Sequence, residues 1–187
     1  MSAAKVSGTA CSGPEFSRPV EASTIGAEPR AITVTATDEE RRRLAGRFRL
    51  AAIGRLEAEL RLVRRGEAIH ADGTASGEAV QHCVVTGDPV PVALDVPIAV
   101  RFVADAPAAG PEEEIELSAE DLDTLPVEDG RIDLGELVAE SFALALDPYP
   151  RAPNADAALA AATPNGSTGG GAFAALAALR GRMPPAD

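Results

Sequence analysis

The sequence has few of the residue types on which many binding sites are built. Among 187 residues there is no Trp, one Tyr and five Phe, so stacking of rings on single-stranded bases is not expected to be its main mode of binding. The two cysteines, Cys11 and Cys83, give no disulfide framework and favour a reduced, cytoplasmic setting. No apolar run is long enough for a membrane span or a signal peptide, so no membrane partner is expected.

Basic residues are outnumbered as well. The sequence has 29 Asp and Glu against 17 Lys and Arg, a formal charge of -12, which argues against a protein that coats nucleic acid by charge alone. Residues 37–70 nevertheless hold nine arginines against six acids, whereas residues 104–140 hold thirteen acids and one arginine. Either both segments are solvated faces, or the first contacts RNA or a ribosomal protein. The candidate contact residues are Arg41, Arg42, Arg43, Arg47, Arg49, Arg61, Arg64 and Arg65.

Motifs for catalysis and for cofactors are absent. The sequence has no G-x-G-x-x-G, P-loop, G-x-S-x-G or H-E-x-x-H. His70, His82 and Cys83 lack the second ligand pair of a structural zinc site. Adjacent residues of a strand point to opposite faces, so His82 and Cys83 do not pair as base and nucleophile, and Cys83 is the better core candidate. We therefore expect no enzyme, cofactor, metal or small-molecule substrate, with a hydrolase acting through the acidic loops as the weakest alternative.

Alternating apolar residues predict an antiparallel hairpin. Residues 31–36 are rich in β-branched side chains and form a candidate strand. Residues 64–67 supply a turn, and residues 69–76 return as the second strand of the hairpin. The inward face of the first hairpin strand consists of Leu56, Ala58, Leu60 and Leu62.

Further strands are predicted beyond the hairpin. Residues 82–90 read as a short apolar strand ending in a Gly-Asp-Pro turn, and residues 92–102 alternate again. Pro91 and Pro97 lie on the other face of this last strand and lack amide donors, so it is expected at an edge or with a bulge. Residues 114–117 are a candidate short strand.

The first helix is predicted by its capping residues. Thr37 and Glu40 form a capping box in which each side chain accepts the amide of the other residue. A helix over 38–48 should follow, with Leu44 and Phe48 as its buried pair.

The second helix is predicted over 134–146. Asp133 is the expected N-cap, with Glu136 completing an acidic capping box, and Asp147 before Pro148 ends the helix. Glu136, Ala139, Glu140 and Ala143 should lie away from the core. The apolar stripe is Leu134, Leu137, Val138, Phe142, Ala145 and Leu146.

These elements predict an α+β fold, in which an antiparallel sheet of four to six strands, open or barrel-like, is packed by two main helices. Residues 1–14 are expected to be a disordered leader and residues 15–153 a single domain. Residues 154–187 are an Ala/Gly-rich tail, with a candidate short helix at 172–182 that either docks or stays free.

Two stretches carry a resemblance. VQHCVVTGDPVPVALDVPIAVRF (80–102), followed by IDLGELVAESFALALDPYPRAP (132–153), resembles the YceD family, the large ribosomal RNA subunit accumulation proteins, in the form typical of alphaproteobacteria. EFSRPV at 15–20 resembles the opening of the same group. Many relatives carry C-x-x-C here, whereas the second position is Thr86 in this chain. The characteristic positions are Cys83, Gly87, Pro89, Asp133, Glu136, Glu140 and Pro150.

The resemblance implies a cytoplasmic, non-enzymatic factor for accumulation or processing of large-subunit ribosomal RNA. Its partner would be precursor RNA, touched by the arginines, or a basic large-subunit ribosomal protein, bound by the acidic residues of 112–140. The alternative is an adaptor unrelated to ribosomes. In either case the stiff, proline-rich exit of the second helix, with Tyr149, Pro150 and Arg151, is a candidate partner contact.

Overall fold

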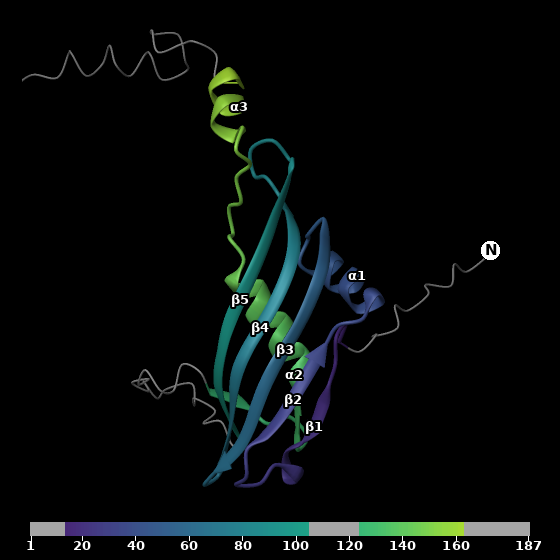
Figure 1. Cartoon of the computed structure of the whole chain (residues 1–187), viewed down its shortest axis with the longest axis vertical. Helices are drawn as coiled ribbons and strands as arrows, with labels where there is room; N and C mark the ends of the chain where they lie inside the picture. Colours follow the sequence, from purple (N-terminus) through teal and green to yellow (C-terminus); the bar gives the residue numbers. More distant parts are fainter. Residues whose placement is uncertain (1–13, 105–123, 163–187) are drawn as a thin grey trace, which may run out of the picture.

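The computed structural model describes residues 14–104 and 124–162, and Figure 1 shows a tall, twisted sheet with helices packed against it. The main elements are β1 (Pro19–Glu21), β2 (Arg30–Thr35), α1 (Asp38–Arg47), β3 (Ala52–Arg65), β4 (Ala68–His82), β5 (Pro89–Val103), β6 (Thr124–Pro126), β7 (Arg131–Asp133), α2 (Leu134–Ala145) and α3 (Ala155–Ala162). A single 3-10 turn, η1 (Ala22–Thr24), follows β1. The predicted α+β class is confirmed.

The main sheet has five strands in the order β2-β3-β4-β5-β6, and β1 pairs with β7 in a separate ribbon. The prediction of an antiparallel sheet is right for β2 to β5 but wrong for β6, which pairs with the end of β5 in parallel. The barrel-like alternative is also wrong, because β2 and β6 remain separate edges. Residues from α1 and α2 share one core with the inner face of the sheet, and so occupy the space around which a barrel would close.

The predicted hairpin is confirmed as β3 and β4, which pair from Ala52 with Val80 to Arg65 with Ala68. Its inward residues are buried as the alternation indicated. The predicted strand over 82–90 is wrong. β4 continues to His82, and the residues after it turn back into β5, so Val84 and Val85 are exposed although their side chains favour strands.

The strand β5 lies at an edge, as its prolines predicted. Between Pro89 and Val100 it pairs only with β4 among the described residues. The position numbers of Pro89, Pro91 and Pro97 differ by even numbers, so their nitrogens, which carry no hydrogen, all face the same edge of the strand. That edge is the free one, because a proline facing β4 would break the ladder.

The capping box of α1 is confirmed, since the Thr37 hydroxyl accepts the Glu40 amide and the Glu40 carboxylate accepts the Thr37 amide. Leu44 is buried and Phe48 is half-buried. At α2 the predicted box is only half present. Asp133 accepts the Gly135 and Glu136 amides, but the Glu136 carboxylate pairs with a guanidinium, which is a stronger donor than an amide.

The apolar stripe of α2 is confirmed for Leu134, Leu137, Val138 and Phe142, which are buried. Two alanines differ from the prediction, since Ala139 is buried and Ala145 is exposed. The last buried residue of α2 is Phe142, so the end of the helix, with Leu144 and Ala145, lies outside the core.

Several predictions fall outside the described residues. These are the leader up to residue 13, the strand at 114–117 and the tail helix at 172–182. The helix α3 lies where only low complexity was predicted. Within the part that the structure describes, no helix is long and apolar enough to cross a membrane.

Candidate functional site

Residues 83–88 form the turn between β4 and β5, here named the Cys83 turn. The Cys83 amide donates to the Asp88 carbonyl at 2.8 Å, and the Gly87 amide donates to the Cys83 carbonyl at 2.9 Å. Gly87 has a φ of 76°, a conformation that favours glycine. Pro89 then begins β5. The Gly and Pro of the predicted motif therefore have local roles in reversing the chain.

The Cys83 sulfur is the centre of a small second core. It accepts the Thr86 amide at 3.4 Å and the Ala152 amide at 3.3 Å. Cys83 is buried and packs with Val90, Ala152 and Ala155. These donors, the Ala152 amide first and Thr86 next, lower the pKa of the Cys83 thiol to about 6. The sulfur thus binds the turn to a segment 69 residues away in sequence.

That distant segment is the proline exit, residues 147–153, which runs alongside the Cys83 turn. The Val84 amide donates to the Pro150 carbonyl at 2.9 Å. The Gln81 side chain donates to the Asp147 carbonyl at 2.8 Å. Pro150 is buried, whereas Tyr149 and Arg151 are exposed, and Arg151 pairs with Asp156 of α3. The structure therefore joins two motifs that the sequence presents separately.

Asp88 and Asn154 add a further link between turn and exit. The Asn154 amide donates to the Asp88 carboxylate at 3.0 Å, and this bond, followed by that from Thr86, lowers the pKa of Asp88. Both hydrogen bonds favour the charged form of the carboxylate.

An open groove of about 480 Å³ lies where the last turn of α2 meets the end of β4. Its walls include Phe48, Arg49, Leu50, Val84, Leu144, Leu146 and Pro148. Leu144 is 87% exposed and Val84 54%, and Tyr149, 73% exposed, lies one residue beyond the lining Pro148. Large apolar side chains gathered at a groove are typical of a protein contact surface.

The acidic positions of α2 hold other elements in place. The Asp133 carboxylate accepts the Ser17 hydroxyl at 2.5 Å and the Arg18 amide at 2.7 Å, which attaches the N-terminal segment to α2. Glu136 accepts both terminal nitrogens of Arg47, at 2.6 and 2.9 Å. Desolvation and the neighbouring charge of Glu136 raise the pKa of Glu140. Asp133 and Glu136 therefore hold the start of α2 against the N-terminal segment and α1.

A family model described as "Large ribosomal RNA subunit accumulation protein YceD" matches residues 71–180. The match covers more than half of the chain and includes the Cys83 turn, α2 and the proline exit. The chain belongs to the YceD family. No curated protein and no solved structure matches it. The narrower alphaproteobacterial type stays a prediction.

In this YceD-family protein the arginines of α1 form ion pairs or hydrogen bonds with other residues of the chain. Arg41 pairs with Asp38, Arg43 with Glu39, and Arg42 donates to the Asp38 carbonyl at 3.1 Å. Arg47 pairs with Glu15 and Glu136. Of the predicted arginine surface of α1, three arginines are therefore neutralised by acids of α1 or of neighbouring segments, and Arg42 is bonded to a carbonyl.

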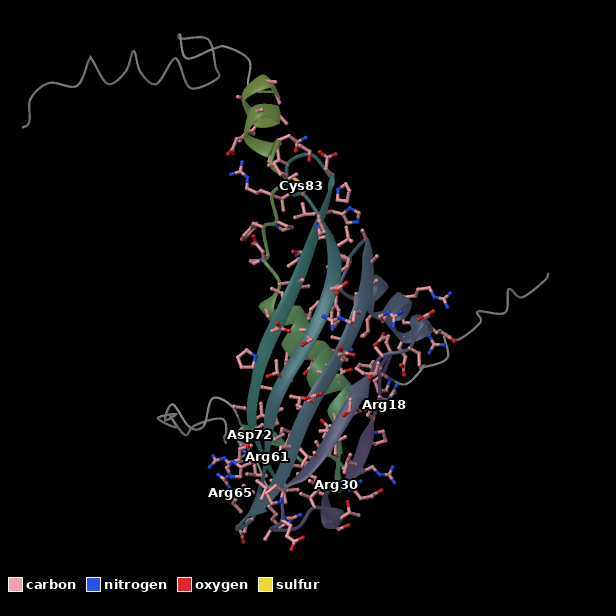
Figure 2. The ribbon with its side chains drawn as sticks, in the orientation of Figure 1. Arg18, Arg30, Arg61, Arg65, Asp72 and Cys83 are labelled. Atoms are coloured by element: carbon pink, nitrogen blue, oxygen red, sulfur yellow. The ribbon has the colours of Figure 1, made fainter. Side chains whose placement is uncertain are left out.

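The arginines of the hairpin differ from those of α1. Arg64 donates to the carbonyls of Ala22 and Ile25, at 2.6 and 3.0 Å, and so has a structural role. Arg61 and Arg65 are exposed and make no hydrogen bond or ion pair with any described residue. Figure 2 places them at the lower end of the sheet, with Arg30 nearby and Cys83 at the opposite end.

Sequence reasoning missed one exposed residue of the groove, Leu144, and one arginine next to the hairpin, Arg30. Leu144 lies off the apolar stripe of α2, and a leucine in that position is a signal that could have been used. Arg30 lies outside the arginine-rich segment, and its proximity to the hairpin depends on the pairing of β2 with β3, which no local pattern predicts. In residues 14–104 and 124–162 no group of three His, Cys, Asp or Glu could hold a metal ion.

Proposed function

We propose that this chain is a non-enzymatic, cytoplasmic factor of ribosome biogenesis. It promotes the accumulation or processing of large-subunit ribosomal RNA through contact with the RNA or with a ribosomal protein. The observation that carries the proposal is the family match, which spans both the Cys83 turn and the proline exit. The family is described by its effect on large-subunit RNA, and the two motifs meet in one place on this fold.

The groove supports a protein contact within this function. Leu144, Val84 and Tyr149 are exposed around it, while the Cys83 sulfur and the Val84 amide hold the proline exit in place. An apolar surface on a rigid support loses little conformational entropy when a partner binds. This arrangement is what a docking surface for an assembly partner requires.

The proposal is tested by deleting the gene and measuring precursor and mature large-subunit RNA. A tagged copy is followed at the same time through a sucrose gradient. We expect mature RNA to fall, precursors to rise, and the protein to travel with large-subunit precursors. Normal RNA levels, with the protein at the top of the gradient on one non-ribosomal partner, would instead support the adaptor alternative.

A groove variant makes this experiment specific. Leu144→Asp places a charge at the groove and should fail to restore RNA levels in the deletion strain, because a buried unpaired carboxylate opposes docking. Leu159→Asp on α3 is the matched control, since Leu159 is also exposed but does not line the groove. Both proteins should fold. Full rescue by Leu144→Asp would exclude the groove from the function.

A further inference from the structure

The groove at the end of α2 has apolar side chains on its walls that no described residue covers. Of the five large apolar side chains that are exposed in the described part of the chain, Leu144 and Val84 line this groove. A third, Tyr149, follows the lining Pro148. Exposed apolar side chains gathered at one place indicate a surface that another segment covers.

The charges of the groove are of both signs. Arg49, His82 and Asp147 line it, and the side chains of Arg49 and His82 make no hydrogen bond or ion pair with any described residue. The helices α1 and α2 both end at the groove, and the last carbonyls of a helix carry partial negative charge. The groove therefore does not strongly select an occupant by charge, and apolar contact decides what binds there.

The sequence after α3 contains an apolar segment. Residues 172–183, here named the tail segment, read AFAALAALRGRM. In a helix, its large apolar side chains fall within one third of the circumference, and they are Phe173, Leu176, Leu179 and Met183. The other positions are alanine, glycine and arginine. Such a stripe is stable as a helix only when another apolar surface covers it.

The chain is long enough for the tail segment to reach the groove. Pro150 lines the groove, and α3 begins five residues later at Ala155 and has 8 residues. The five residues, if extended, and the helix together place the end of α3 at most about 30 Å from Pro150. Residues 163–171 span up to about 30 Å when extended. The tail segment can therefore return to the groove from the end of α3.

The family match supports a role for the tail segment. The match ends at residue 180, so most of the tail segment belongs to the same family pattern as the Cys83 turn and the proline exit. A tethered segment also has an advantage over a free one, because a short linker gives an effective concentration in the millimolar range. Even weak apolar contact is then sufficient for binding.

We propose that the tail segment binds in the groove of its own chain, with its apolar stripe against Val84 and Leu144. This inference rests on the proposed function, because it concerns the regulation of the same groove. The tail segment covers the groove until an assembly partner displaces it. The apparent affinity for that partner is reduced by the fraction of molecules in which the groove is covered.

The test uses the full chain with photoreactive benzoylphenylalanine in place of Val84 or of Leu144, which are both exposed. After irradiation at low protein concentration, peptide mass spectrometry identifies the cross-linked residues. We expect cross-links to residues 172–183 of the same molecule. Thr74 is the control position, since it is exposed on the open face of the sheet and its neighbour Ala75 faces the core. The same replacement there should give no cross-link to the tail segment.

Charges on the apolar stripe make the test specific. Phe173→Asp with Leu176→Asp should lower the cross-link yield roughly tenfold or more, because a charge in the apolar contact opposes docking. The matched control is Ala175→Asp with Ala178→Asp, which adds the same charge to the opposite face of the helix. This control should keep most of the yield. Equal losses in the two double variants would overturn the proposed contact.

Two other results would also overturn the proposal. One is the absence of cross-links to the tail segment from both groove positions. The other is a majority of cross-links between two molecules, detected by mixing isotopically labelled and unlabelled chains, because a second copy would then be the occupant.

Failure of this contact is distinguishable from failure of the proposed function. If Leu144→Asp fails to restore large-subunit RNA and the tail segment forms no cross-link, the groove serves the function and the tail segment does not regulate it. If the cross-links form but deletion of the gene leaves that RNA unchanged, the tail segment docks and the proposed function fails.

Discussion

Gly77 lies within β4, directly beneath the ring of Phe142 from α2. A Cβ atom at this position would be 2.3 Å from Cε2 of Phe142, and that side chain is fully buried. Gly77→Ala therefore forces the helix away from the sheet. We expect a loss of about 1–3 kcal/mol in the free energy of unfolding, measured with urea.

Gly46 of α1 is the control for this prediction. Apart from the backbone of its own helix, no atom lies within 4 Å of the position that a methyl group would take at Gly46. Gly46→Ala should therefore stabilise the protein by up to about 1 kcal/mol through helix propensity. If Gly77→Ala proves as stable as the wild type, the close packing of α2 on β4 is wrong.

Cys83 makes stability depend on pH. Its pKa of about 6 in the folded protein lies below the ordinary value of 9.0 for the unfolded thiol. Between these values the unfolded chain binds the additional proton, so stability rises with pH from about 6 to about 9. The contribution is complete above that range and is lost as pH falls through 6.

The pH dependence is measured as the free energy of unfolding of Cys11→Ser protein, which keeps Cys83 as its one thiol. Cys83→Ala in the same background should lack the rise. Parallel curves for the two proteins would show that the Thr86 and Ala152 amides do not stabilise a thiolate.

At the scale of elements, Arg47 connects three segments that are far apart in sequence. Its guanidinium at the end of α1 reaches Glu15 before β1 and Glu136 on α2. We expect Arg47→Ala to cost about 1 kcal/mol, with the difference shrinking at high salt.

Arg43→Ala removes an ion pair confined to α1 and is the comparison for Arg47. It should cost at most about 0.5 kcal/mol, because a pair within one exposed helix turn restrains nothing else. Equal costs for the two variants would mean that Arg47 does not tie the helices together.

Local sequence patterns predicted most of these helices and strands, because each pattern depends only on which residues of one element face the core or cap its end. The alternation of Leu56 to Leu62 and the capping box at Thr37 require no distant partner, and both predictions were confirmed. Val84 and Val85 favoured a strand, but bonds between Cys83 and Asp88 closed a turn there. Each half of the candidate site was visible in the sequence, whereas the bond from Val84 to Pro150 depends on how the whole chain folds.

At the scale of the whole molecule, charge clusters in sequence are not charge clusters in space. β3 has 14 residues, so at a rise of ~3.3 Å each it carries Arg65 roughly 40 Å from its first residue. The arginine-rich segment is thereby divided between α1 and the far end of the sheet. The sequence alone could count these arginines. It could not tell which of them form ion pairs, since an ion pair depends on the distance between the arginine and an acid in the folded chain.

The prolines of β5 also bear on how the protein behaves in a crowded cell. A long sheet with an unpaired edge is a template on which strands of other copies can add, and continued addition grows a fibril. Pro89, Pro91 and Pro97 remove donors from that edge at three positions, so an incoming strand meets an interrupted ladder. The same residues that make β5 a poor partner for another strand thus oppose the growth of a fibril from this edge of the open sheet.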